Sequence, residues 1–257
     1  MKTDRHIDIM GIVNLTDDSY FAQSRCGSVD AVLKRTHHMV SDGADIIDVG
    51  ACSSRPGSAA VGPDVEWSRL RPALEAMRRH FPDVRISVDT YYSSVVEWVH
   101  DLIGDFIVND ISSGEDDPAM LGVVGKLGLS YVAMHKRGDS LTMSGLTEYD
   151  DVTNDLIRYF ESFSVKADSF GIRDWVIDPG FGFAKTVEQN YQLLNGLERI
   201  RGNQRVLVGV SRKSMIYNPL GITPEEGHRL PDDPVHPKYC HRILCLLPHR
   251  HPMQTMH

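Results

Sequence analysis

Short apolar runs alternate with amphipathic segments along most of the chain. The runs are rich in valine and isoleucine and are apolar throughout, which is typical of strands buried on both faces. Seven such runs occur, at residues 7–13, 45–49, 85–88, 105–108, 130–134, 175–177 and 205–210. Strands of this kind, separated by helices, predict a parallel sheet that helices cover.

The segments between the runs show helical periodicity. Residues 67–81 place five apolar side chains at spacings of three and four, which predicts an amphipathic helix with one buried stripe. Two later segments repeat this pattern, at Val152, Leu156 and Phe160 and at Val187, Tyr191, Leu194 and Leu197. The chain therefore contains seven recognisable strand–helix units.

Each apolar run ends at a polar residue, and these ends carry the functional signal. The residues are Asn14, Asp48, Asp89, Asn109, Asp110, His135, Asp178, Ser211 and Lys213. Polar groups at the carboxyl ends of successive parallel strands are typical of the active face of an α/β (β/α)8 TIM barrel. An open doubly wound sheet is the rival, but it calls for a glycine-rich phosphate turn after the first strand, and residues 11–16 are not one.

Three of these residues suggest recognition of a heterocycle. Asp89, Asn109 and Asp178 follow three different strands, so a closed barrel would bring them to one mouth. Carboxylates accept hydrogen bonds and an amide both donates and accepts, which together complement a fused ring with an amino-amidine edge. The alternative is that they are ordinary turn and cap residues, which Asp and Asn also favour.

Four loops add further candidates. Residues 178–185 form a glycine-containing turn in which Phe181 and Phe183 offer flat apolar surfaces. Residues 210–214, with Lys213, follow the seventh strand, where such barrels often bind phosphate. Arg55, in the loop 53–57, suits an anion. The oxygens of Asn14, Thr16, Asp17 and Asp18 suit Mg²⁺. His135 is a candidate structural residue. The alternatives are a plain tight turn for 178–185, a solvated charged loop for 210–214 and flexible surface for the other two loops, and we favour a functional role in each case.

The composition limits the classes of partner that the chain can bind. The chain has 257 residues and a net charge of −8, so no broad basic face is available for nucleic acid. The four cysteines include no C-x-x-C pair, and neither an apolar signal region nor a run long enough for a membrane span occurs. We therefore expect a cytoplasmic protein that acts on small molecules, without nucleic acid or membrane partners.

The motifs taken together resemble the dihydropteroate synthases of the pterin-binding barrel family. The matching stretches are MGIVNLTDDSYF (10–21), DIIDVGACSSRPG (45–57), SVDTY (87–91), VNDISSG (108–114), MHKRG (134–138), DPGFGF (178–183) and GVSRKS (209–214). They follow the family order over residues 10–226. Pterin-binding methyltransferases that use methyltetrahydrofolate and corrinoid proteins share the barrel, but the RPG loop and the SRKS turn favour the synthase.

The resemblance implies a reaction and a set of roles. The family joins 6-hydroxymethyl-7,8-dihydropterin pyrophosphate to p-aminobenzoate and releases pyrophosphate, and sulfonamides occupy the p-aminobenzoate pocket. Pterin would be bound by Asp89, Asn109, Met134, Asp178 and Lys213. The p-aminobenzoate pocket would contain Ser54, Arg55, Pro56, Phe183 and Ser214. Asn14 would position Mg²⁺, Arg55 and Lys213 would be the catalytic cations, and members commonly form homodimers through late helices.

The resemblance ends near residue 226. The remaining 31 residues contain six of the twelve histidines and five of the thirteen prolines, and only residues 242–247 could form a strand. The family's eighth strand with its Arg-x-His-Asp motif is not found there. We therefore expect a pterin-binding barrel domain at 1–226, an atypical tail at 227–257 that is no separate domain, and an eighth β/α unit that is missing or aberrant.

Two hypotheses about the tail and three about the function remain open. A frame change in the coding sequence would explain the tail, and a histidine-rich metal-binding tail is the rival explanation. The chain is either a synthase, a methyltransferase-like domain, or an inactive pterin-binding barrel. A barrel that lacks its eighth strand would expose two unpaired strand edges.

Overall fold

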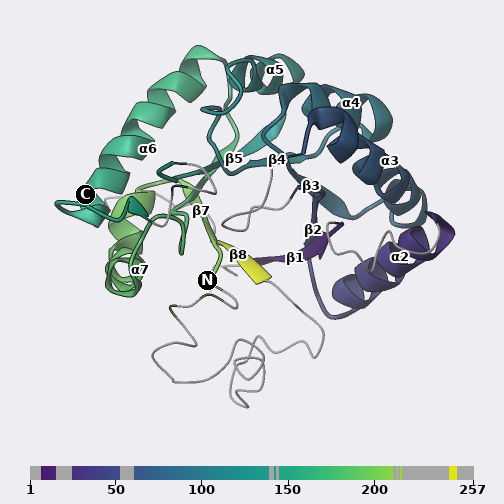
Figure 1. Ribbon diagram of the computed structural model, residues 1–257, viewed down its shortest axis with the longest axis horizontal. Helices are drawn as coiled ribbons and strands as arrows, with labels where there is room; N and C mark the ends of the chain where they lie inside the picture. Colours follow the sequence, from purple (N-terminus) through teal and green to yellow (C-terminus); the bar gives the residue numbers. More distant parts are fainter. Residues whose placement is uncertain are drawn as a thin grey trace, which may run out of the picture.

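Eight strands form a closed barrel whose neighbours follow chain order (Figure 1). The computed structural model describes residues 7–15, 25–52, 61–138, 142, 145–210, 213, 215 and 243–247. The strands are β1 (Asp8–Asn14), β2 (Ile46–Gly50), β3 (Arg85–Asp89), β4 (Ile107–Asp110), β5 (Ser130–Met134), β6 (Trp175–Asp178), β7 (Arg205–Val208) and β8 (Ile243–Leu247). From β1 to β7 every neighbouring pair is parallel, which confirms the predicted barrel of parallel strands and helices.

The eighth strand is the departure from a regular barrel. β8 pairs antiparallel with β1 on one side and with β7 on the other. Its direction is opposite to that of a regular eighth strand, and the described part of the chain contains no helix after it. The expectation of an aberrant eighth unit is confirmed. The expectation of two unpaired edges is wrong, because β8 closes the ring by hydrogen bonding to both.

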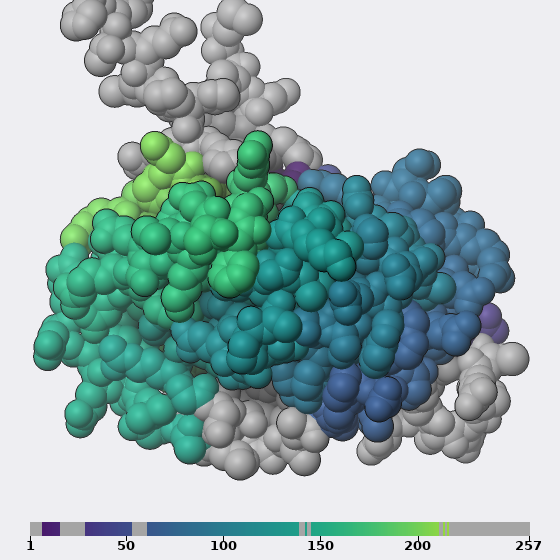
Figure 2. All heavy atoms as spheres, turned by 90° about the horizontal axis from the view of Figure 1, so that it is seen from above, coloured from purple at the N-terminus to yellow at the C-terminus, as the bar shows by residue number. Residues whose placement is uncertain are grey.

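In the part of the chain that the structure describes, six helices surround the strands on the outside. They are α2 (Arg25–Ser41), α3 (Pro63–His80), α4 (Ser93–Ile103), α5 (Met120–Leu127), α6 (Val152–Ser169) and α7 (Val187–Arg201). The space-filling view shows the blue, teal and green segments packed into one continuous body (Figure 2). α7 begins with a capping box in which the side chains of Thr186 and Gln189 each bond the other's backbone N–H.

The predicted stripe on α3 is buried, but the predicted stripe on α7 is only half right. Val187 and Leu197 pack against the core, whereas Tyr191 and Leu194 are 39% and 40% exposed and Leu193 and Ile200 are buried instead. Gly196 explains the difference, since a β-carbon there would lie 2.7 Å from Thr153 Cγ2 of α6. α7 therefore packs on α6 through a small residue, and its buried face is rotated from the one that the hydrophobic periodicity indicates.

Alternation along the strands separates two apolar clusters. The lower barrel interior contains Met10, Ile46, Val132, Val176 and Leu207, with Ile107 packed against them. The larger cluster fills the space between strands and helices and includes Leu70, Leu74, Leu156 and Phe160. Because side chains alternate between faces, residues two or four places beyond the interior cluster also point inward. This alternation sets which side chains reach the mouth of the barrel.

The expected domain boundary at residue 226 lies outside the described residues.

Candidate active site

Five of the predicted ligand residues lie on the inner face at the carboxyl ends of the strands. Asn14, Asn109, Met134 and Asp178 lie two or four residues beyond a member of the interior cluster on their own strands. Asp89 is the register partner of Asn109, and Met134 is the register partner of Asp178. The fold therefore brings residues from five strands to one mouth, although they are separated by up to 164 positions in the sequence.

A buried polar group below the mouth orients Asn109. Ser87 Oγ donates to Asp48 Oδ1 at 2.6 Å, and Asn109 Nδ2 donates to the same oxygen at 3.2 Å. Asp48 is 2% exposed, and burial raises its pKa while these two hydrogen bonds oppose the rise. With its nitrogen bonded to Asp48, the amide of Asn109 presents its carbonyl oxygen on the opposite side as an acceptor.

Gly50 leaves room for two oxygens at the end of β2. It is the register partner of both Asn14 and Asp89. A β-carbon at Gly50 would lie 3.2 Å from Asp89 Oδ2 and 3.6 Å from Asn14 Oδ1. Both oxygens therefore face the bare α-carbon of Gly50, and a β-carbon at this position would press on the Asp89 carboxylate.

The turn after β6 presents Asp178 at the mouth. Gly180 N donates to Asp178 Oδ1 at 2.7 Å, and His135 N donates to the backbone oxygen of Asp178 at 3.0 Å. Burial raises the pKa of the Asp178 carboxyl, while Lys213, the Gly180 N–H and Lys185 oppose the rise. Gly180 has φ +66°, and a β-carbon there would lie 2.1 Å from His135 O, so this turn requires glycine.

Lys213 lies across the same turn. Its methylene chain passes over Gly182, where a β-carbon would lie 3.2 Å from Lys213 Cδ. Its Nζ donates to Phe181 O and lies 4.9 Å from the centroid of the Phe183 ring. Phe183 is half-buried beside this cation, but Phe181 has no exposed surface and belongs to the core. The expectation that Phe181 faces a ligand is therefore wrong, because its ring points into the protein.

Several predicted residues lie outside the described residues. These are Thr16, Asp17, Asp18, Ser54, Arg55, Pro56 and Ser214. Their roles in binding p-aminobenzoate, pyrophosphate and Mg²⁺ therefore stay predictions.

The residues at the ends of β1 and β3 could supply only some of the ligands of a magnesium ion. Asn14 Oδ1 and Asp89 Oδ2 are oxygens of the kind that Mg²⁺ prefers, and both face Gly50. Among the described residues, no group of three or more His, Cys, Asp and Glu side chains could hold a metal on its own. These two oxygens fit a magnesium ion whose other ligands come from a phosphate group and from water.

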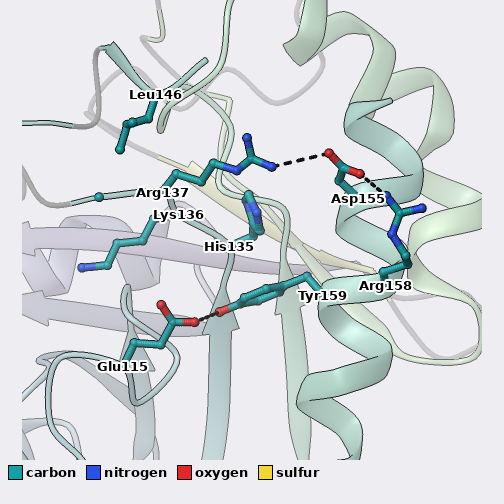
Figure 3. A pocket seen from close by; sticks show the side chains of 9 residues that line it. Glu115, His135, Lys136, Arg137, Leu146, Asp155, Arg158 and Tyr159 are labelled. Atoms are coloured by element: carbon teal, nitrogen blue, oxygen red, sulfur yellow. Dashed lines mark hydrogen bonds and ion pairs between the residues drawn. The ribbon is translucent and has the colours of Figure 1, made fainter. Parts of the chain in front are cut away.

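A separate cavity of about 640 Å³ lies between the segment 135–138 and α6 (Figure 3). Its lining residues are Glu115, His135, Lys136, Arg137, Gly138, Leu146, Asp155, Arg158 and Tyr159. Arg137 and Arg158 both contact Asp155, and Tyr159 OH donates to Glu115 at 3.1 Å. None of the residues predicted to bind substrate lines this cavity, and these charged groups pair with one another.

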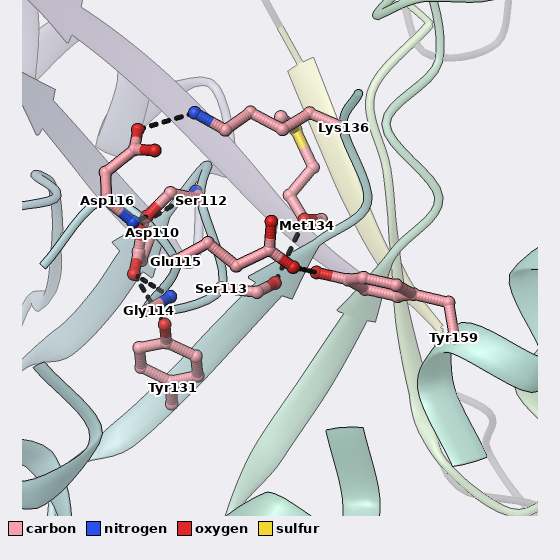
Figure 4. A network of polar contacts seen from close by, with 10 residues as sticks. All are labelled: Asp110, Ser112, Ser113, Gly114, Glu115, Asp116, Tyr131, Met134, Lys136 and Tyr159. Carbon is pink, nitrogen blue, oxygen red and sulfur yellow. Dashed lines mark hydrogen bonds and ion pairs between the residues drawn. The ribbon is translucent and has the colours of Figure 1, made fainter. Parts of the chain in front are cut away.

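A buried network supports β4 and β5 from behind the mouth (Figure 4). Asp110 accepts hydrogen bonds from Tyr131 OH at 2.6 Å, from the N–H and Oγ of Ser112 at 2.7 Å each, and from Gly114 N at 2.8 Å. Burial raises the pKa of Asp110, and these donors oppose the rise. Asp110, which directly follows Asn109, therefore fixes the turn at residues 111–114 in place.

Comparison with known proteins matches the sequence and the fold of the chain. A family model described as "Pterin binding enzyme" matches residues 10–235. The chain belongs to the pterin binding enzyme family. Within the described residues, every helix falls short of the length and apolarity that a membrane span needs.

Relatives in this family are named for folate synthesis. The chain is 39% identical over 230 residues to the Arabidopsis thaliana "Folate synthesis bifunctional protein, mitochondrial", covering 83% of this chain and 41% of that protein. It is 38% identical over 224 residues to the Escherichia coli (strain K12) dihydropteroate synthase, covering 86% of this chain and 78% of the relative. The chain thus spans less than half the length of the plant relative.

Two solved structures of family members are similar in fold. The Yersinia pestis dihydropteroate synthase with a sulfonamide drug complex superposes with a TM-score of 0.76 at 35% identity, covering 85% of this chain and 79% of that one. The Xanthomonas albilineans dihydropteroate synthase with 4-aminobenzoic acid gives a TM-score of 0.75 at 34% identity, covering 85% and 78%.

Sequence reasoning missed the residues that support the family site. Asp48 was recognised only as a polar strand end, and Lys185 was assigned no role. The signal for Asp48 was a carboxylate inside an otherwise apolar run, and the signal for Lys185 was a lysine directly after a glycine-rich turn. His135, a candidate structural residue, has its Nδ1 3.2 Å from Lys185 Nζ, and burial lowers its pKa to about 3.

Proposed function

We propose that this chain is a dihydropteroate synthase, which joins 6-hydroxymethyl-7,8-dihydropterin pyrophosphate to p-aminobenzoate and releases pyrophosphate. The observation that carries the proposal is the inward-facing set of Asp89, Asn109, Met134 and Asp178 in a pterin binding enzyme barrel. The names of the Escherichia coli and Yersinia pestis relatives support the same activity.

The polar set matches the hydrogen-bonding edge of a pterin. Amino and ring N–H groups need acceptors, which the carboxylates of Asp89 and Asp178 and the carbonyl oxygen of Asn109 supply. Met134 is 3% exposed and lies next to Asp178 in register, where its thioether suits the flat face of the ring. The pterin would therefore be held by its edge and packed on one face.

The chemistry needs charge stabilisation more than a strong base. The bond between the pterin methylene carbon and the pyrophosphate oxygen breaks, and pyrophosphate leaves with the electron pair. The amine nitrogen of p-aminobenzoate forms the new bond to this carbon and then loses a proton to water. Positive charge that develops on the ring is stabilised by the carboxylates of Asp89 and Asp178.

Lys213 borders Phe183, so one ammonium and one aromatic ring flank the approach to the pterin. We assign Arg55 and Lys213 to the anionic groups of the substrates and Phe183, Ser54, Pro56 and Ser214 to p-aminobenzoate. Mg²⁺, held through Asn14 and the pyrophosphate, would neutralise charge on the leaving group.

One observation favours a second candidate function. β8 is antiparallel, and the tail lacks the Arg-x-His-Asp motif that ends the eighth strand elsewhere in the family. Part of the pyrophosphate-binding site would then be missing, while the residues that bind the pterin stay in place. A barrel that binds pterin but turns over slowly is therefore the alternative.

Titration with 6-hydroxymethylpterin, together with a pyrophosphate-release assay, tests these proposals. Asp178→Asn is expected to weaken pterin binding at least tenfold, because an amide replaces the carboxylate acceptor. Asp168→Asn, on the exposed surface of α6, is the matched control and should bind normally. Pterin binding with pyrophosphate release only when p-aminobenzoate is present supports the synthase. Binding without release supports the alternative, and wild-type binding by Asp178→Asn contradicts the site.

We further propose a cytoplasmic homodimer that contacts through α7. Tyr191 and Leu194 give this helix an exposed apolar surface. Light scattering of the wild-type chain and of Leu194→Asp tests the contact, with a monomer expected for the variant and equal masses contradicting it. Cell fractionation tests the compartment.

A further inference from the structure

Lys185 lies buried between the turn after β6 and the end of β5. Lys185 is 8% exposed. Nζ donates to Phe183 O at 2.9 Å, to Gly180 O at 3.1 Å and to His135 O at 3.4 Å. It also lies 3.2 Å from His135 Nδ1. One ammonium therefore ties together two segments that both end at the mouth.

These segments carry residues of the proposed site. His135 directly follows Met134, and the carbonyls of Gly180 and Phe183 belong to the turn that begins at Asp178. The two backbones touch at Gly180, where a β-carbon would lie 2.1 Å from His135 O. The carbonyl oxygens of His135, Gly180 and Phe183 all converge within 3.4 Å of Lys185 Nζ. Converging carbonyl dipoles repel one another unless a donor lies between them, and the Lys185 ammonium is that donor.

Charged groups from three elements face this ammonium. Burial lowers the pKa of Lys185 to about 7; Asp178 of β6 opposes that shift, whereas Lys213 after β7 and Arg137 after β5 add to it. His135 is neutral at pH 7, because burial together with Lys185 and Arg137 lowers its pKa to about 3, so its Nδ1 can accept from the ammonium. The Lys185 charge in turn favours the ionised form of Asp178.

We propose that Lys185 is a positioning residue, whose buried ammonium sets the Asp178 carboxylate and the Phe183 ring for the pterin and p-aminobenzoate. This role rests on the proposed function for the identity of the ligands. Lys185 itself contacts only the carbonyls and the imidazole, and it acts on the substrates through the turn 178–183.

The wild-type chain and three variants test the role. Lys185→Met removes the charge at similar length, Lys185→Arg keeps a cation, and Lys166→Met removes an exposed lysine of α6 as the matched control. The dissociation constant of 6-hydroxymethylpterin is measured from about pH 6 to about pH 8, across the pKa of Lys185. Circular dichroism and urea unfolding report whether each variant folds.

We expect wild-type affinity to fall severalfold as pH rises through about 7, where the ammonium loses its proton. Lys185→Met should bind about tenfold more weakly at about pH 6 and show a flat profile, while Lys166→Met follows the wild type. Lys185→Arg should restore affinity at the alkaline end. In steady-state kinetics, KM for p-aminobenzoate should rise more than kcat falls, since the reacting atoms are untouched.

Three results would overturn the role. A folded Lys185→Met that binds pterin like the wild type would do so, as would a wild-type profile that is flat from about pH 6 to about pH 8. The wild-type profile needs no variant, so it decides the matter even if Lys185→Met fails to fold. If the wild type binds no pterin, both proposals fail together. If it binds pterin but forms no dihydropteroate, the synthase proposal fails and the binding profiles still test Lys185.

Discussion

Replacing Gly50 with alanine adds one methyl group beside the proposed pterin and magnesium ligands. The new carbon would lie 3.2 Å from Asp89 Oδ2, 3.4 Å from Asp89 Cβ and 3.6 Å from Asn14 Oδ1. Gly50 lacks the positive φ that disfavours other residues, so the backbone accepts alanine. The perturbation therefore acts on the two oxygens and not on the fold.

The expected displacement is a few tenths of an ångström at Asp89. The 3.2 Å contact with Asp89 Oδ2 is the tight one, while Asp89 Cβ and Asn14 Oδ1 lie at ordinary van der Waals distances, so the carboxylate itself has to move. A shift of this size weakens a charge-assisted hydrogen bond by about 1–2 kcal/mol, which corresponds to a 5–30-fold weaker affinity for pterin. Stability should change by less than about 1 kcal/mol, since the entropic gain of about 0.4–1 kcal/mol from replacing glycine offsets the strain.

Isothermal titration with 6-hydroxymethylpterin measures the affinity, and urea unfolding measures the stability. Gly122→Ala is the matched control, because Gly122 lies in α5 and its added carbon meets only Phe170 at 3.9 Å. This control should gain about 0.5–1 kcal/mol of stability and bind pterin normally. Normal pterin binding by a folded Gly50→Ala would show that Asp89 and Asn14 do not contribute to the site.

Three further predictions test other parts of the molecule. Tyr131→Phe removes the 2.6 Å hydrogen bond to the buried carboxylate of Asp110 and should lower the free energy of unfolding by about 1.5–3 kcal/mol in urea; a loss below about 0.5 kcal/mol would contradict the role of this network. Burial lowers the pKa of His135 from its ordinary value of 6.5 to about 3 in the folded chain, so its stabilising contribution is complete above about pH 6.5 and is lost as pH falls toward 3. The stability advantage of wild type over His135→Gln should therefore shrink by up to about 1.4 kcal/mol per pH unit below about pH 6, and a constant advantage would refute the buried neutral imidazole. Chelation of Mg²⁺ should abolish pyrophosphate release but leave 6-hydroxymethylpterin binding intact, and full release in EDTA would exclude the ion from the reaction.

Most of the fold could be predicted from local sequence because its signal is local. Apolar runs marked β1 to β7, and the polar residue after each run marked the mouth. The face of α7 could not be predicted, because burial there depends on Gly196 meeting Thr153 of a different helix. The direction of β8 was equally hidden, since five apolar residues fit either direction and the two neighbouring edges select one.

The candidate site divides in the same way. Asp89, Asn109 and Asp178 could be predicted because a parallel barrel gathers the ends of its strands. The supporting contacts of Asp48 and Lys185 could not, because they depend on which buried carbonyl or amide lies within 3.5 Å of a side chain. Phe181 shows the limit of loop reasoning, since two phenylalanines two positions apart face opposite sides of the same turn.

Formation of 7,8-dihydropteroate by the full chain is the most direct test of the account. The chain is incubated with 6-hydroxymethyl-7,8-dihydropterin pyrophosphate, p-aminobenzoate and Mg²⁺, and 7,8-dihydropteroate and pyrophosphate are quantified by chromatography. The account predicts equal amounts of both products, and their loss in Asp178→Asn. Saturable pterin binding without any dihydropteroate would contradict it and would assign the chain to pterin binding alone.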